Sequence, residues 1–436
     1  MRIITQTLTR FVTVKAQETG ALLVSCAYFY LVLCAYYVIR PIRSEMAIAN
    51  GVQNIQWLLL LTMLVLFAIT PFFGWVTSRF KTRQFLSYCT LFFASHLVLF
   101  FFLFDVDTRS PIVTRSFYVW VNVFNMFIVS LFWSFMNDIY SQAQTKRLFA
   151  FIAAGGTAGA LTGPIITSTL VQQLGLAPLL LISAIILASS VLCINWLSNW
   201  KNQDLSIIAD SPDDNTQRLK GGAWDGLLLI LKSPYLAGIC LFIALYAISI
   251  TFVQIQQAEL VEQTYSNPNQ RTQLFSQIDF AANALTLIFQ LFLTSRLIQW
   301  LGYRTTLLII PVGITIGFGV MAATPMLAVM VGVEIFRRSG DYAIMKPARE
   351  MLFSVVSREE KYKAKNFIDT TILRTGNTAS AWLYTGIRAL GASGAGVAIV
   401  SVSLGVAWCT ISYWLGSQYL KRTPDYIDNK TPKTAK

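Results

Sequence analysis

A chain of 436 residues with 55% hydrophobic and only 13% charged residues is too apolar for a soluble domain, in which charged residues make up about a quarter. Most of its side chains must therefore face lipid or each other. The net charge of +13 does not indicate a nucleic-acid partner, because the basic residues are sorted by membrane side rather than gathered in one patch.

Twelve apolar segments are long enough to cross a bilayer, which takes roughly 20 residues. We predict an all-α membrane protein with spans near residues 20–47, 54–76, 84–104, 116–137, 149–171, 176–197, 233–256, 273–294, 303–323, 326–347, 365–388 and 393–418. The first segment is full length and no small-residue cleavage site follows it, so we expect an anchor rather than a cleaved signal peptide.

Basic residues outside the spans indicate the topology. They concentrate in the N-terminal segment, the even-numbered loops and the tail, and few lie on the other side: Arg109, Arg115, Arg271 and Arg388. Because cytoplasmic loops carry the excess of Lys and Arg, we expect both termini in the cytoplasm of a cell with this protein in its inner membrane. The six cysteines fall inside spans without CxxC spacing and are interpreted as apolar filler.

The chain divides into two similar halves. Residues 198–225 form a polar, linker-like stretch between residues 1–197 and 226–436. The loop GWVTSRFKTRQFL is similar to SRLIQWLGYRTTLL in the second half, and KRLFAFI is similar to KAKNFID. Parallel repeats of six helices around a site near the membrane midplane are typical of transporters.

The loop containing Gly74, Ser78, Arg79 and Arg83 resembles the second-loop signature of the major facilitator superfamily, with Ser78 where that signature has an acid. The resemblance implies a gating role for Arg79. The alternative is a solvated basic loop that only obeys the topology.

Charged residues within spans are costly, roughly 2.5–3.5 kcal/mol for an arginine at the bilayer centre, so each needs a partner or a watery cavity. In the tenth span, four such residues share one face at i, i+3, i+4 and i+7. They are Glu334, Arg337, Arg338 and Asp341. We expect either a self-neutralising cluster or a gate whose pairs exchange during transport.

Arg40 and Arg43 share a face of the first span, with Pro41 as a possible bend between them. They are candidate contacts for an anion. Alternatively they extend to the membrane surface, since Arg40 lies about 30 Å along the helix at 1.5 Å per residue.

Further polar residues at mid-span depth are candidates for a substrate cavity or, alternatively, for hydrogen bonds between helices. The fourth span provides Asn122 and Asn125, the eighth Asp279, and the eleventh Asp369, Arg374 and Asn377. Gly155, Gly159 and Gly163 in the fifth span are interpreted as a helix-packing stripe. A single histidine, His96, and no clustered ligands argue against a membrane-embedded enzyme or a metal site.

Three stretches resemble the ATP/ADP translocases of intracellular bacteria and plastids, a nucleotide-transporter family with the facilitator fold. They are YYVIRPIRSEM (36–46), LFWSFMNDIYSQAQTKRLFAFIAAGGTAGALTGP (131–164) and KPAREMLFSVVSREEKYKAKNFIDTTILRTGNTAS (346–380). The resemblance implies that Arg40 and Arg43 match the family's basic pair. The family's acid in the fourth helix falls on Asn122, and its lysine in the eleventh falls on Asn377.

We therefore expect a secondary transporter, not an enzyme, that works by alternating access without a cofactor. Its substrate would be an organic anion or a nucleotide-like phosphorylated metabolite, with exchange as one mode of transport, and the protein would act as a monomer in the bilayer. The alternatives are proton- or gradient-coupled transport of another amphipathic solute, such as a siderophore or drug, and a membrane scaffold or sensor that transports nothing.

Overall fold

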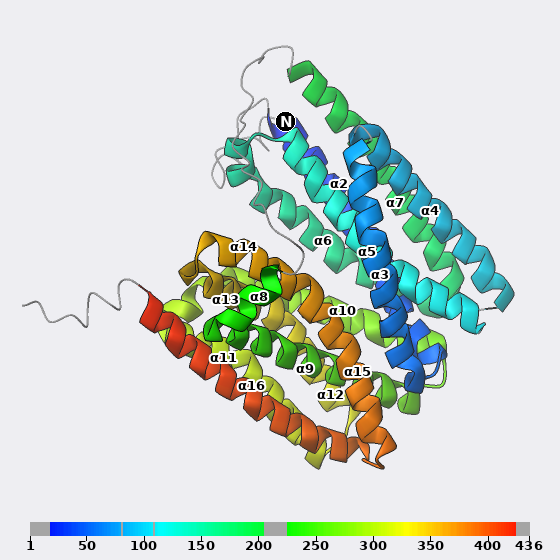
Figure 1. Ribbon diagram of the computed structural model, residues 1–436. Coiled ribbons are helices and arrows are strands. Elements are labelled where there is room, and N and C mark those ends of the chain that lie inside the picture. Colours follow the sequence, from blue (N-terminus) through cyan, green and yellow to red (C-terminus); the bar gives the residue numbers. More distant parts are fainter. Residues whose placement is uncertain (1–17, 80–81, 108–109, 205–224, 424–436) are drawn as a thin grey trace, which may run out of the picture. The chain divides into compact units, whose positions relative to one another are not determined.

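The computed structural model describes residues 18–79, 82–107, 110–204 and 225–423, and these residues form helices joined by short connections (Figure 1). The helices that precede residue 205 are α2 (Thr19–Ala49), η2 (Val52–Asn54), α3 (Ile55–Arg79), α4 (Thr82–Asp107), α5 (Pro111–Ile139), α6 (Gln142–Leu174) and α7 (Leu176–Asp204). The helices after it are α8 (Asp225–Lys232), α9 (Pro234–Thr264), α10 (Pro268–Phe292), α11 (Thr294–Ala323), α12 (Leu327–Gly340), η3 (Asp341–Met345), α13 (Lys346–Leu352), η4 (Phe353–Val355), α14 (Arg358–Phe367), η5 (Ile368–Ile372), α15 (Leu373–Ala389) and α16 (Gly394–Arg422).

Ten helices in the described parts of the chain are long and apolar enough to cross a membrane. The remaining two predicted spans are helical as well, but each contains a π-helical turn: η3 joins α12 to α13, and η5 joins α14 to α15. Each π turn contains an aspartate, Asp341 or Asp369. The expectation of an all-α, multi-pass membrane protein is confirmed.

The chain forms two compact units. Unit 1 contains the described residues within Met1–Gly51, Leu64–Asp214 and Tyr265–Phe280, and unit 2 contains those within Val52–Met63, Asn215–Thr264 and Ala281–Lys436. The first half of α10 thus belongs to unit 1, although it follows α9 of unit 2 in sequence. The sequence-based division at residues 198–225 stays a prediction.

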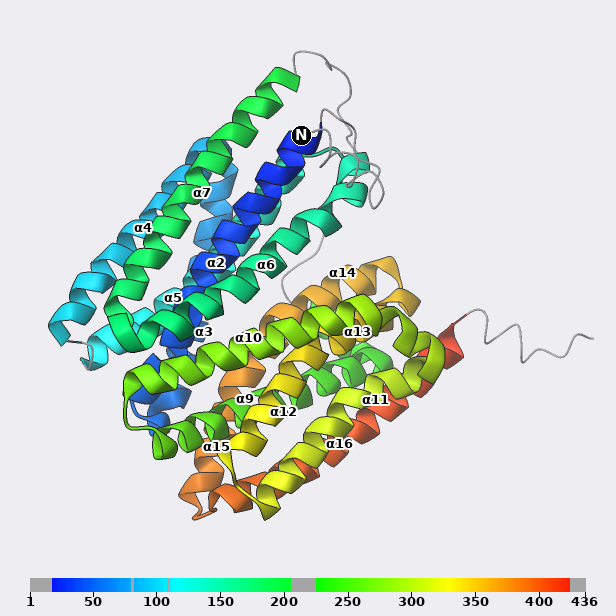
Figure 2. The same ribbon diagram turned by 180° about the vertical axis from the view of Figure 1, so that it is seen from behind.

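Unit 1 is built around α2, which contacts α5, α6 and α7 (Figure 2). Its closest neighbour is α6, because Gly155, Gly159 and Gly163 face its backbone. A methyl group at Gly159 would overlap the carbonyl oxygen of Tyr30, and one at Gly163 would lie 2.8 Å from the carbonyl oxygen of Cys34. The packing role predicted for this stripe is confirmed, and it lets two helix backbones touch.

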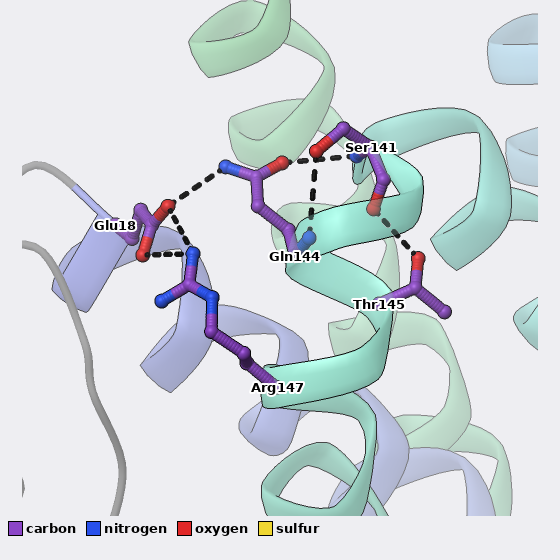
Figure 3. Close-up of polar contacts among 5 residues, drawn as sticks. All are labelled: Glu18, Ser141, Gln144, Thr145 and Arg147. Carbon is purple, nitrogen blue, oxygen red and sulfur yellow. Dashed lines mark hydrogen bonds and ion pairs between the residues drawn. The ribbon is translucent and has the colours of Figure 1, made fainter.

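A polar cluster ties the start of α2 to the start of α6 (Figure 3). Arg147 donates to Glu18 at 3.1 Å, and the side-chain amide of Gln144 donates to the same carboxylate at 3.0 Å. Gln144 also accepts from the backbone N–H of Ser141 in a capping box that satisfies free donors of the first turn of α6. The two helices are therefore joined by polar contacts at one end and by glycines along their length.

Unit 2 is arranged around α9, which contacts α12, α15 and α16. Helix α11 lies along α16 (Figures 1 and 2), and here too small residues face the neighbouring helix: a methyl group at Gly416 would lie 3.0 Å from the Cα of Arg304. Gly302 has φ 75° and ψ 163° and interrupts α11, a conformation that a residue with a side chain rarely adopts.

We expect Gly159→Ala to destabilise the protein, because its methyl group must displace the α2 backbone; overpacking of this kind costs typically about 1–3 kcal/mol. The matched control is Gly319→Ala in α11, where an added methyl group meets nothing within 4 Å and alanine improves helix propensity by up to about 1 kcal/mol. Thermal unfolding of detergent-purified protein measures both. Equal melting temperatures for the two variants would contradict the backbone contact.

Candidate functional site

The basic pair of α2 lies within unit 1, where its two members have different partners. Nη1 of Arg40 lies 3.0 Å from Oδ1 of Asp279 in α10, and the Arg40 guanidinium lies 5.4 Å from the centre of the Tyr37 ring. The Arg40 side chain is 19% exposed and that of Asp279 is 7% exposed. Arg40 is thus held by a largely buried carboxylate.

Arg43 has a neutral partner. Its Nη1 donates to Oδ1 of Asn122 in α5 at 3.1 Å, and its guanidinium lies 5.7 Å from the centre of the Tyr118 ring. Its Nε is buried without a hydrogen-bond partner, and no carboxylate in the described parts of the chain forms an ion pair with it. Among the side chains that the structure describes, Arg43 therefore has no carboxylate close enough to pair with its positive charge.

A second ion pair near the end of α2 was not anticipated from the sequence. Arg271, near the start of α10, donates from Nε and Nη2 to the two oxygens of Glu45 at 2.8 and 2.7 Å. The Glu45 side chain is 0% exposed and that of Arg271 is 11% exposed. An acid inside an apolar span was a signal for such a partner, but Arg271 was interpreted only as a residue on the outer side.

The first half of α10 is joined to its neighbours in unit 1 by polar contacts. In addition to the two ion pairs with α2, Gln273 accepts from Gln172 at 3.0 Å and donates to the carbonyl oxygen of Ser168 at 3.1 Å, both in α6. Arg40 and Arg271 are paired with carboxylates, whereas Arg43 has no carboxylate within ion-pair distance among the described residues.

In unit 2, the cluster of the tenth span is partly self-paired, as expected. Arg337 donates from Nε and Nη2 to Glu334 at 2.8 and 2.7 Å, with both side chains 6% exposed. Asp341 accepts a hydrogen bond from the hydroxyl of Tyr246 in α9. Arg338 is also buried, so all four residues lie inside unit 2, where their charges offset one another.

The polar residues of the eleventh span have separate surroundings in unit 2. Asp369 lies 3.3 Å from Nη2 of Arg349 in α13. The carbonyl oxygen of Asn377 accepts from Thr251 of α9 at 3.4 Å, and its side-chain oxygen is buried without a partner. Arg374 is half-buried. Of the predicted substrate contacts, the structure groups Arg40, Arg43 and Asn122 with Asp279 in unit 1, and places Arg374 and Asn377 in unit 2.

Two predicted residues add little to this site. Asn125 is half-buried in α5, one turn beyond Asn122. Arg79 ends α3, but its side chain lies outside the described residues. Among the side chains that the structure describes, no three His, Cys, Asp or Glu residues gather closely enough to hold a metal ion.

Removing the acid of the Glu45–Arg271 pair should be strongly destabilising, because it leaves a buried cation uncompensated, a change worth about 3–5 kcal/mol. We expect Glu45→Ala to lower the unfolding temperature and Glu45→Ala/Arg271→Ala to restore part of it. The control is Glu350→Ala, whose acid pairs with Lys365 but is 47% exposed, and which should cost less than about 1 kcal/mol. No recovery in the double variant would show that the pair is not coupled.

Comparisons with known proteins find a matching family model and several relatives. A family model described as TLC ATP/ADP transporter matches residues 114–323 and 314–419. ADP,ATP carrier protein 1 of Chlamydia trachomatis is 26% identical over 345 residues, which cover 69% of this chain and 63% of the relative. ADP,ATP carrier protein 2 of Chlamydia pneumoniae is 22% identical over 446 residues, which cover 84% and 82%. The chain thus spans less than two thirds of the length of the first of these relatives.

Solved structures define the fold. The nucleoside transporter NupG superimposes with a TM-score of 0.62 at 13% sequence identity, over 92% of this chain and 99% of that one. A bacterial homologue of the iron transporter ferroportin in its inward-facing state gives a TM-score of 0.61 at 14% identity, over 92% and 98%. The predicted major-facilitator-type fold is confirmed.

Proposed function

Because the chain belongs to the TLC ATP/ADP transporter family, we propose that it is a secondary transporter of a nucleotide-like phosphorylated metabolite or another organic anion. It resides in the inner membrane with both termini in the cytoplasm, in keeping with its basic loops. It alternates access to the two sides by movement of residues 1–197 against residues 226–436.

The observation that carries this proposal is the state of Arg43. An arginine inside a membrane span is costly unless a partner offsets its charge. Arg40 and Arg271 have carboxylates, whereas Arg43 has an amide and an aromatic ring. A cation that the protein leaves uncompensated fits a site where the substrate supplies the negative charge.

Exchange fits the electrostatics of such a substrate. Moving one elementary charge through 100 mV is worth about 2.3 kcal/mol, so import of a multiply charged anion into a negative-inside cell is opposed by several kcal/mol. Exchange against an internal anion of similar charge removes most of this cost. The ion pair of Arg40 with Asp279 supports the same view, because Asp279 can compensate Arg40 while no substrate is bound.

Liposomes containing the purified protein test this function. We expect uptake of a labelled nucleotide that accelerates when unlabelled nucleotide is enclosed, and a loss of at least about tenfold in Arg43→Gln, since charge-assisted contacts contribute about 1.5–3 kcal/mol. The matched control is Arg296→Gln, an exposed arginine that contacts the ring of Trp300. Absence of uptake with and without internal nucleotide would remove the proposed substrate class.

Coupling to a proton gradient is the second candidate, favoured by buried carboxylates in the spans. Glu45 and Asp279 are both less than about a tenth exposed, and ionisable groups at such depth serve as proton carriers in many transporters. In this case a pH gradient without internal substrate should drive accumulation, and Asp279→Asn should abolish the gradient dependence. Strict exchange predicts that an imposed pH gradient leaves the uptake rate unchanged.

A further inference from the structure

The contacts of Asn122 fix the orientation of its side-chain amide. Its Nδ2 donates to the carbonyl oxygen of Tyr118 at 2.8 Å, and its Oδ1 accepts from Nη1 of Arg43 at 3.1 Å. The opposite orientation would set the amide oxygen against the carbonyl and the NH₂ group against the guanidinium. Only one orientation pairs each donor with an acceptor.

An aspartate could not replace this amide without loss. One carboxylate oxygen would approach the Tyr118 carbonyl, where two acceptors would repel each other, and the other would neutralise Arg43. The two contacts therefore require a side chain that both donates and accepts, and Asn122 makes them without adding a negative charge. Asn122 holds the guanidinium while leaving its positive charge intact.

A comparison with other arginines that have buried partners shows which edge of the Arg43 guanidinium lacks a hydrogen-bond acceptor. Arg271 and Arg337 each use the Nε and Nη2 edge of the guanidinium to grip two oxygens of a glutamate. Arg43 uses Nη1 for Asn122, and within the described parts of the chain its Nε and Nη2 have no acceptor. This edge has the geometry that binds two oxygens of a carboxylate or phosphate.

We propose that Asn122 is a positioning residue that fixes Nη1 of Arg43 so that the Nε and Nη2 edge binds two oxygens of a phosphate group. The inference rests on the proposed function and names the substrate chemistry of that site, a phosphorylated anion. Because Arg43 is not neutralised, affinity rises with each negative charge that the ligand carries. Asn122 thereby determines charge selectivity without contacting the anion.

The probes are inorganic phosphate, pyrophosphate and tripolyphosphate at matched ionic strength, with thermal stabilisation of the detergent-purified protein as the readout, since ligand binding raises apparent stability by mass action. We expect the wild-type protein to bind tripolyphosphate most tightly. Asn122→Asp should weaken tripolyphosphate binding by at least about tenfold and phosphate binding by less, which flattens the ranking.

Two variants separate positioning from charge. Asn122→Ala should weaken all three probes by a similar factor of about three to ten without changing their order. Arg43→Lys keeps the charge but lacks the two-donor edge, and should weaken phosphate binding by about tenfold. The control is Ser116→Asp, which adds the same charge at an exposed position of the same helix and should leave the ranking unchanged.

The outcomes separate this inference from the proposed function. It is overturned if Asn122→Asp keeps the wild-type ranking, if Ser116→Asp flattens it equally, if Arg43→Lys binds like the wild type, or if no probe stabilises the wild-type protein. If the liposomes take up no nucleotide while the probes bind and Asn122→Asp flattens their ranking, the inference stands and the nucleotide transport fails. If the liposomes take up labelled nucleotide while Asn122→Asp keeps the wild-type ranking of the probes, the proposed function stands and the inference fails.

Discussion

The close contact between α2 and α6 is the constraint on which the site of unit 1 depends. Helix α2 carries Arg40, Arg43 and Glu45. Its backbone lies against the glycine stripe of α6, formed by Gly155, Gly159 and Gly163. In lipid, apolar side chains gain little from contacting one another, so close packing of backbones contributes much of the attraction between helices. This direct contact defines the position of α2 against α6. The arginines therefore project from a fixed helix rather than from an adjustable one.

Charge compensation differs among four arginines of the described helices, Arg40, Arg43, Arg271 and Arg337. Arg40, Arg271 and Arg337 each meet a carboxylate at hydrogen-bond distance, which offsets the cost of taking a cation out of water. Among the described residues, Arg43 contacts an amide and a ring but pairs with no carboxylate. Compensated pairs stabilise a conformation, whereas an uncompensated cation attracts a ligand of opposite charge, and that difference indicates where a substrate anion binds.

Interrupted helices are concentrated in unit 2. The π turns η3 and η5 contain Asp341 and Asp369, which contact Tyr246 and Arg349 in neighbouring helices. Turns of this type insert an extra residue into a helix and often occur at functional sites. They also divide these two spans into shorter α-helices, α12 and α13 in one and α14 and α15 in the other. Unit 2 thus combines a charge network with helices that contain irregular turns.

The sequence by itself determined the membrane-spanning class, the helix positions and the glycine stripe, because apolar length and four-residue spacing are local properties. It also placed Glu334 and Arg337 one turn apart on one face of the tenth span, where a self-neutralising cluster was one of the two expected outcomes. The partners of Arg40, Arg43 and Glu45 come from α10 and α5, far away in the chain, and no local spacing indicates them. Only the tertiary structure decided which arginine a carboxylate neutralises and which keeps its charge.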